Sequence, residues 1–240
     1  MNKEKLLYEN SKHALQSDNI IAITNRHLCS RPFMEQLERV CKLHPHAIVL
    51  REKDMPEAEY LSLARDVIAL CKKYAVQCML HSFINVAMEL EHPYIHLPLP
   101  ILEAYVKKNV SGNISTGMSK STDNYQQFFK VIGTSVHSVE DAIKAEQLGA
   151  TYMTAGHIFA TDCKKGLPPR GLDFLKNVCD AVGIPVYAIG GINIASNNNS
   201  TASDSPSTYD AVPDISVPRL ADVMKCGAAE GCIMSGMMRV

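Results

Sequence analysis

Residues 150–191 read ATYMTAGHIFATDCKKGLPPRGLDFLKNVCDAVGIPVYAIGG, and this stretch decides the fold. Two short apolar runs, at 150–156 and 184–191, flank a long polar connection and an amphipathic pattern that begins at Gly171. Apolar strands that alternate with helices are typical of a parallel sheet, because each crossover helix covers one face of the sheet. The stretch therefore predicts a strand, a long loop, a helix and a second, parallel strand.

The same alternation extends along the whole chain. Further strand-like runs are expected at 20–24, 47–52, 76–80, 94–99, 130–137 and 229–236, with helical patterns between them. About eight strand–helix units predict an α/β fold of the TIM (β/α)8 barrel type. A doubly wound sheet is the alternative, but it usually has fewer strands and a glycine-rich first turn, which residues 22–32 lack.

We expect a single domain over residues 1–240, with two segments outside the repeat. Residues 1–19 form an N-terminal extension with helical apolar spacing, and residues 194–215 form a low-complexity insertion rich in Ser, Asn, Thr and Asp. The few residues after the eighth strand predict that a regular final helix is missing. The N-terminal extension, or a partner subunit in a homodimer, would then cover that flank of the barrel.

The composition argues against several classes of protein. The formal charge of −1 gives no electrostatic footprint for nucleic acid, and no apolar run approaches the ~20 residues of a membrane span. The N-terminal residues are too polar for a signal peptide. Most of the eight cysteines lie inside periodic segments, and no CxxC pair or zinc-like spacing occurs. We therefore expect reduced thiols and a cytoplasmic location.

Cations, histidines and glycines follow the predicted strands. In a TIM barrel the carboxyl ends of the strands meet at one rim, where the functional groups lie. The residues expected there are Arg51, Lys53, His81, His96, Ser135, His137, His157, Thr161, Cys163, Lys164, Gly190, Gly191, Met234 and Ser235. This composition predicts an anion-binding site.

The turns after the seventh and eighth strands are the most specific part of this rim. Gly190 and Gly191 would let backbone N–H groups approach phosphate oxygens, and the turn at Met234 and Ser235 would add a hydroxyl. Loops at this place often bind phosphate in TIM barrels. The alternative is that the two glycines only make a tight turn.

Two further groups of side chains invite a chemical interpretation. Arg51 and Lys53 alternate with Glu52, so both cations are expected on one face, where they would hold a carboxylate or a phosphate. The alternative is a solvated strand end with a Glu52–Lys53 pair. Histidine exchanges protons readily near neutral pH, so His137 is a candidate proton shuttle. Its alternative role is that of a structural hydrogen-bonding residue.

The motifs of the rim resemble the thiamine phosphate synthase/TenI family. AIT at 22–24, LREKD at 50–54, GTSVHS at 133–138, GHIFATDCKKG at 156–166, AIGGIN at 188–193 and MSGM at 234–237 match this family in order and spacing. The resemblance covers residues 20–238 and implies a TIM barrel. It also implies a phosphorylated thiazole as the small-molecule ligand. The synthases of the family join a pyrimidine pyrophosphate to a thiazole phosphate, with magnesium held by carboxylates.

The chain departs from the synthases where they hold the metal. The third strand ends in His81-Ser82 rather than Asn-Asp, and residues 96–102 (HLPLPIL) lack the carboxylate of the usual Gly-Gln-x-Asp loop. Magnesium prefers oxygen ligands, so we expect no metal site and weak or absent synthase activity.

The GHIFATDCKKGL stretch is more similar to the TenI branch, a thiazole tautomerase that moves a proton and needs no cofactor. The resemblance implies that His137 is the shuttle. It also implies that Ser135, Thr161 and Lys164 border the pocket with Arg51 and Lys53, while Asp162 and Lys165 order the loop. His157 is a candidate second acid or base, or else shapes the loop.

Three functions therefore remain open. The first is an isomerase that aromatises a carboxythiazole ethyl phosphate. The second is a synthase that recruits magnesium through other groups, such as Glu52 or Asp54. The third is a non-catalytic protein that binds thiazole or thiamine phosphates for regulation.

Overall fold

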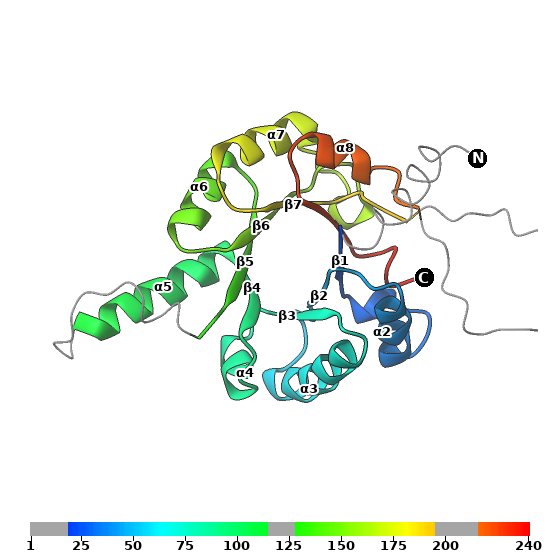
Figure 1. Ribbon diagram of the computed structural model, residues 1–240, viewed down its shortest axis with the longest axis vertical. Coiled ribbons are helices and arrows are strands. Elements are labelled where there is room, and N and C mark those ends of the chain that lie inside the picture. The colour runs from blue at the N-terminus through cyan, green and yellow to red at the C-terminus, as the bar shows by residue number, and fades with distance from the viewer. Residues whose placement is uncertain (1–18, 115–127, 195–215) are drawn as a thin grey trace, which may run out of the picture.

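The computed structural model describes residues 19–114, 128–194 and 216–240, and it forms a closed barrel of eight parallel strands (Figure 1). Each strand pairs with the next along the chain, and β1 closes the barrel on β8, with Ile21 opposite Cys232. The strands are β1 (Ile20–Ile23), β2 (Ala47–Leu50), β3 (Gln77–His81), β4 (Tyr94–Pro98), β5 (Val131–Val136), β6 (Tyr152–Gly156), β7 (Val186–Ile189) and β8 (Glu230–Ile233). The predicted TIM barrel is confirmed.

Helices form an outer ring around the barrel (Figure 1). They are α2 (Phe33–Lys42), α3 (Glu57–Lys73), α4 (Ile84–Glu89), α5 (Leu99–Ile114), α6 (Val139–Gln147), α7 (Gly171–Ala181) and α8 (Leu220–Lys225), with short 3-10 turns at Arg26–Leu28 and Asp162–Lys164. Ser138 begins α6 because its side chain accepts a hydrogen bond of 3.0 Å from the amide of Asp141.

The chain after β8 makes turns and no helix, as the sequence predicts. This segment is nevertheless fastened to the barrel, since Gln36 of α2 donates to the carbonyl of Met237 at 2.7 Å and to that of Val240 at 3.2 Å. Met237 and Met238 are buried in the outer core. Residues 1–18 and 195–215 lie outside the described part of the chain, so the predictions for the N-terminal extension and the insertion stay predictions.

Apolar side chains fill two separate spaces. One core lies between the strands and the helices, and the other lies inside the barrel, where Ile21, Ile23, Val49 and Met79 surround the ring of Tyr152. That ring needs room from the neighbouring strand, and Gly133 provides it. A Cβ atom at Gly133 would lie 2.1 Å from the Tyr152 Cζ atom, too close for any real contact. The barrel interior therefore holds the Tyr152 ring only because residue 133 has no side chain.

The cysteines behave as packing residues. All eight thiols are free, and Cys41, Cys71, Cys78 and Cys232 are buried. Within the described residues, no helix is both long and apolar enough to cross a membrane.

A methyl group at position 133 tests this packing. We expect Gly133→Ala to lower the free energy of unfolding by about 1–3 kcal/mol, because the methyl group overlaps the Tyr152 ring. Urea unfolding followed by circular dichroism measures the change. The double variant Gly133→Ala/Tyr152→Leu should lose less stability than the sum of the two single variants. Strict additivity would contradict the proposed clash.

Candidate functional site

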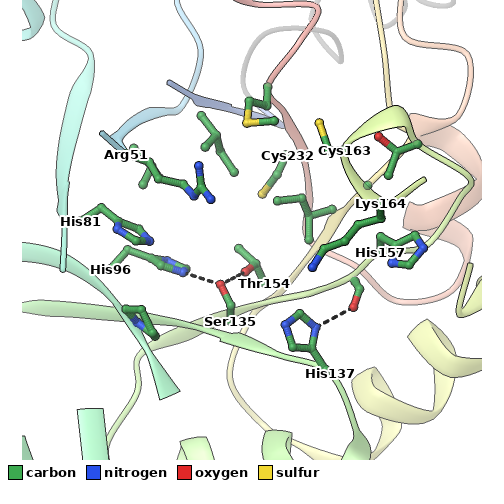
Figure 2. Close-up of a pocket in the computed structure, with 18 of the residues that line it drawn as sticks. Arg51, His81, His96, Ser135, His137, Thr154, His157, Cys163, Lys164 and Cys232 are labelled. Carbon is green, nitrogen blue, oxygen red and sulfur yellow. Dashed lines mark hydrogen bonds between the residues drawn. The ribbon is translucent and has the colours of Figure 1, made fainter. Parts of the chain in front are cut away.

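A cavity of about 660 Å³ opens at the carboxyl ends of the strands. The structure places most of the strand-end residues there, although it does not test their roles, and Glu52, Ser82 and Gly236 do not line the cavity. The strand-end residues that line it are Arg51, Lys53, His81, His96, Ser135, His137, His157, Thr161, Cys163, Lys164, Gly190, Gly191, Met234 and Ser235. Figure 2 shows Arg51 and Lys164 extending into the cavity from opposite walls. Asp162 and Lys165 of the same loop do not line it.

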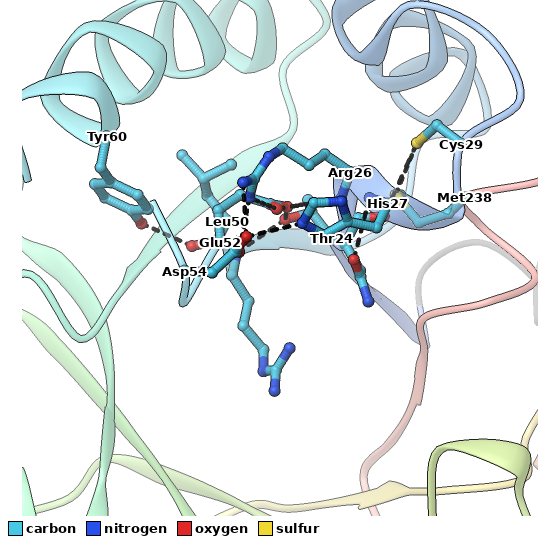
Figure 3. A network of polar contacts seen from close by, with 11 residues as sticks. Thr24, Arg26, His27, Cys29, Leu50, Glu52, Asp54, Tyr60 and Met238 are labelled. Atoms are coloured by element: carbon cyan, nitrogen blue, oxygen red, sulfur yellow. Dashed lines mark hydrogen bonds and ion pairs between the residues drawn. The ribbon is translucent and has the colours of Figure 1, made fainter. Parts of the chain in front are cut away.

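The strand end at 51–53 separates its charges onto two faces. Glu52 is only 2% exposed, and its carboxylate accepts hydrogen bonds from the Thr24 hydroxyl at 2.6 Å and from Arg26 Nη1 at 3.0 Å. Arg26 also binds Asp54 at 2.8 Å, so that Arg26 lies between two carboxylates (Figure 3). The alternative Glu52–Lys53 pair is therefore wrong, because Glu52 faces away from the cavity.

The cavity wall carries cations that these carboxylates do not neutralise. Burial lowers the pKa of Lys53, and the nearby charges of Arg51 and Lys164 lower it further. Burial also lowers the pKa of Arg51. Two carboxylates lie on the cavity wall. Glu103 pairs with Lys144 at 2.8 Å, and Asp141 accepts a hydrogen bond of 3.3 Å from the amide of His137. Arg51, Lys53 and Lys164 therefore present positive charge to one cavity.

The turn after β7 requires its two glycines. Gly190 and Gly191 have φ values of +100° and +69°, in the region that favours glycine. A Cβ atom at Gly190 would lie 2.3 Å from the Cβ atom of His157, and one at Gly191 would lie 2.6 Å from the carbonyl oxygen of Ala160. The loop after β6 therefore packs directly against the Cα atoms of both glycines, which line the cavity.

Arg219, which sequence reasoning missed, holds this turn through a hydrogen bond. Arg219 Nη1 donates a hydrogen bond of 2.7 Å to the carbonyl of Gly191, and the guanidinium lies 4.6 Å from the centre of the Phe159 ring. On the other side of the turn, the Ser235 hydroxyl donates to Asn193 Oδ1 at 3.2 Å. The turns after β7 and β8 are thereby joined. Arg219 could not have been found from spacing, because the insertion separates it from the glycines.

His137 has a defined orientation at the rim. Its Nδ1 atom lies 2.8 Å from the carbonyl oxygen of Gly156 (Figure 2). A carbonyl oxygen only accepts, so Nδ1 carries the hydrogen, and the neutral ring keeps a lone pair on Nε2. The side chain is exposed to the cavity. This arrangement permits proton exchange at Nε2.

Two histidines form the wall between β3 and β4. The rings of His81 and His96 are nearly parallel, with centroids 5.6 Å apart. Burial and the charges of Arg51 and Lys53 lower the pKa of His96 to about 3. Burial, His96 and the same cations lower the pKa of His81 to about 2. Both imidazoles are therefore neutral near pH 7, and the wall they form offers single donors and acceptors rather than charge.

The rim does not fit the magnesium site that the resemblance implies for synthases. The ends of β3 and β4 present His81, Pro98 and Leu99, which supply no hard oxygen ligand from a side chain. Glu52 and Asp54, the groups expected to recruit magnesium in a synthase, are bound to Arg26 and do not line the cavity. In the described parts of the chain, no group of three or more His, Cys, Asp or Glu side chains is placed to bind a metal ion.

The loop after β6 is held by its backbone. The carbonyl of His157 accepts a hydrogen bond of 3.0 Å from the amide of Arg170, which supports the loop-shaping interpretation of this residue. Its Nε2 atom is buried and has no partner among the described residues. The Cys163 thiol is exposed at the mouth, and nothing in the described geometry pairs it with a base.

The fold is a TIM barrel, and cations line its mouth. A family model described as "Thiamine monophosphate synthase" matches residues 20–204. A protein of Aquifex aeolicus (strain VF5) named "Putative thiamine-phosphate synthase 2" is 34% identical over 178 residues, which are 74% of this chain and 87% of that protein. The chain belongs to this family of thiamine-biosynthesis enzymes.

Other relatives agree with this assignment. The thiamine-phosphate synthase of Caldanaerobacter subterraneus subsp. tengcongensis is 30% identical over 175 residues, or 72% of this chain and 75% of that protein. The solved structure of a thiamine phosphate pyrophosphorylase from Pyrococcus furiosus matches with a TM-score of 0.64 and 24% identity, and covers 92% of this chain and 87% of that one. At this identity the structural match shows the fold alone.

The neutral histidine wall predicts a dependence of stability on pH. In an unfolded chain histidine titrates near pH 6.5, so the unfolded state binds more protons than the folded state between about pH 6.5 and 3. The contribution of these two neutral histidines to the free energy of unfolding is therefore complete above about pH 6.5. On acidification, the free energy of unfolding should fall by up to about 1.4 kcal/mol per pH unit for each of His81 and His96.

Urea unfolding at several pH values between about 7.5 and 4.5 measures this slope. The double variant His81→Asn/His96→Asn should have a clearly shallower slope, whatever its stability at neutral pH. An equal slope in the two proteins would contradict the assignment of these neutral imidazoles.

Proposed function

We propose that this chain is a thiazole tautomerase-like isomerase that aromatises a carboxythiazole ethyl phosphate by proton transfer. One observation carries the proposal. His137 is held by the carbonyl of Gly156 with Nε2 available, in a cavity that has anion anchors but lacks the carboxylates of a magnesium site at β3 and β4. Such a cavity suits a reaction in which only a proton moves.

The two ends of the substrate fit two parts of the cavity. The phosphate binds at the turn of Gly190 and Gly191, where backbone amides can approach it. The carboxylate binds the cations Arg51 and Lys53, with Lys164 at the opposite wall. The heterocycle then lies between these anchors, within reach of His137.

The chemical step needs no further reagent. His137 Nε2 takes a proton from a saturated ring carbon, and the electron pair of that C–H bond enters the ring as the exocyclic double bond shifts inward. The outer carbon of that double bond receives a proton, which the imidazolium returns. One C–H bond breaks and one forms, so no oxidant or metal is consumed. A positioned acid–base group of this kind supplies roughly 10²–10⁴-fold in rate.

A thiamine-phosphate synthase is the second candidate, because the relatives are named as thiamine-phosphate synthases, one of them putative. In that reaction a pyrophosphate leaves, and its charge would have to be stabilised by Arg51, Lys53 and Lys164. The missing carboxylates at β3 and β4 argue against magnesium-assisted transfer by the usual groups.

Replacement of the shuttle tests the tautomerase. We expect His137→Asn to lower kcat about 10²–10⁴-fold and to change KM by less than about threefold, because the asparagine amide can still donate to Gly156 but cannot exchange a proton. The appearance of aromatic absorbance from the thiazole precursor measures turnover.

His44→Asn is the matched control, since His44 is exposed, lies outside the cavity and has a positive φ that asparagine tolerates. Its turnover should equal that of the unchanged protein. Full activity of His137→Asn would remove this residue from the mechanism.

A second measurement separates the two enzymes. We expect aromatisation to proceed unchanged with a chelator present, and we expect thiamine phosphate formation from the pyrimidine pyrophosphate to be absent or very slow with or without magnesium. Rapid, magnesium-dependent thiamine phosphate formation would favour the synthase. Tight binding of the thiazole phosphate with neither reaction would favour a regulatory binding protein.

A further inference from the structure

A chain of four side chains runs from the barrel interior to the wall of the cavity. Tyr152 and Thr154 come from β6, His96 from β4 and Ser135 from β5. The Tyr152 hydroxyl lies 2.9 Å from His96 Nδ1, and His96 Nε2 lies 2.9 Å from Ser135 Oγ. Thr154 Oγ1 is also 2.9 Å from Ser135 Oγ. Figure 2 shows the outer part of this chain, where His96 and Thr154 both point to Ser135.

Tyr152, at the inner end of this row of hydrogen bonds, sets which group donates and which accepts. Tyr152 is 4% exposed, and among the described residues its hydroxyl has only His96 Nδ1 as a partner. Burial raises the pKa of Tyr152 well above its ordinary value, so the hydroxyl keeps its hydrogen. A buried O–H group without an acceptor costs about 1–3 kcal/mol. The hydroxyl therefore donates to Nδ1.

The orientation of the Tyr152 hydroxyl determines which ring nitrogen of His96 carries the hydrogen. His96 is 3% exposed and neutral, so one ring nitrogen carries a hydrogen and the other accepts. Since Nδ1 accepts from Tyr152, the hydrogen is on Nε2, which must donate to Ser135 Oγ. Thr154 is 3% exposed, and among the described residues its hydroxyl has only Ser135 Oγ as a partner. Because a buried O–H group needs an acceptor, it also donates to Ser135 Oγ.

A hydroxyl oxygen accepts two hydrogen bonds and donates one. Both acceptor positions of Ser135 are occupied, by His96 and by Thr154, and neither neighbour can take the hydrogen of Ser135 in return. Ser135 lines the cavity and is half-buried. The hydrogen of the Ser135 hydroxyl is therefore directed into the cavity, toward a bound molecule.

We propose that Tyr152 is a positioning residue, which acts through His96 to make the Ser135 hydroxyl a fixed hydrogen-bond donor to the bound molecule. The ligand atom against β5 must then be an acceptor, such as a carboxylate oxygen or an unprotonated ring nitrogen. An amino group at that place would meet a hydrogen and be rejected. The inference rests on the proposed function only in placing the substrate in this cavity.

The tautomer of His96 gives a direct test that needs no ligand. Nitrogen-15 NMR of histidine-labelled protein, with two-bond ring couplings, identifies the ring nitrogen that carries the hydrogen. A His96→Gln variant assigns the signal. We expect the Nε2–H tautomer in the unchanged protein, and loss of its uniform population in Tyr152→Phe.

Tyr187→Phe is the matched control. The Tyr187 ring is 4.8 Å from that of Tyr152, but its hydroxyl makes no hydrogen bond to His96. It should leave the His96 tautomer unchanged. Urea unfolding shows whether either variant loses its fold. The proposal is overturned by the Nδ1–H tautomer in the unchanged protein, or by a Tyr152→Phe spectrum identical to that of the control.

Binding measures the consequence for the ligand. By calorimetry, we expect Tyr152→Phe and Ser135→Ala each to weaken the carboxythiazole ethyl phosphate about tenfold, and the double variant to be no weaker than Ser135→Ala alone. Inorganic phosphate, the control probe for the glycine turn, should bind each variant within about twofold. Additive losses would overturn the positioning role. If the thiazole phosphate fails to bind the unchanged protein, the proposed function fails, and the NMR tautomer still decides the inference.

Discussion

Glu52 lies between two cations in the sequence but on the opposite face of the strand end, where Thr24 and Arg26 bind its carboxylate. A buried carboxylate must be paired, because an isolated one carries a large desolvation penalty. The pairing also holds the backbone, since the amide of Arg51 donates to the Thr24 hydroxyl at 2.9 Å. The positive wall of the cavity depends on this arrangement, because a carboxylate on the other face would neutralise the cations.

The positive charges on this wall affect the protonation of the histidines beside it. His81 and His96 lie close to Arg51 and Lys53 and are buried, so both effects act against protonation. His137 lies at the rim, exposed and oriented by a backbone carbonyl. The site thus separates two uses of one residue type. The buried histidines supply fixed hydrogen bonds, while the exposed His137 is the group that we propose for proton exchange.

Much of this could be read from the sequence, because the features concerned are local. Apolar runs indicated eight strands, and the rule that strand ends meet at one rim gathered most of the cavity residues. Several strands were predicted too long. For example, β2 ends at Leu50 rather than residue 52, since the amide of Arg51 bonds to a side chain instead of the ladder.

Partners far apart in the chain could not be predicted. Thr24 and Glu52 are 28 residues apart, and His96 and Tyr152 are 56 apart. No spacing rule links them, because only the closed register of the barrel brings β1 beside β2 and the β4 and β6 side chains together across β5. The direction in which each hydroxyl points follows from burial, which a single sequence does not reveal.

The bond between Arg219 and the carbonyl of Gly191 has a consequence for how this protein tolerates change. Residues 192–218 join Gly191 to Arg219 along the chain, so the two ends of this connection are clamped to one another. A longer connection then costs only loop-closure entropy, about 0.6 kcal/mol for each doubling of its length. The position between these two anchors is accordingly a natural place to graft a foreign domain or a reporter without moving the glycine turn.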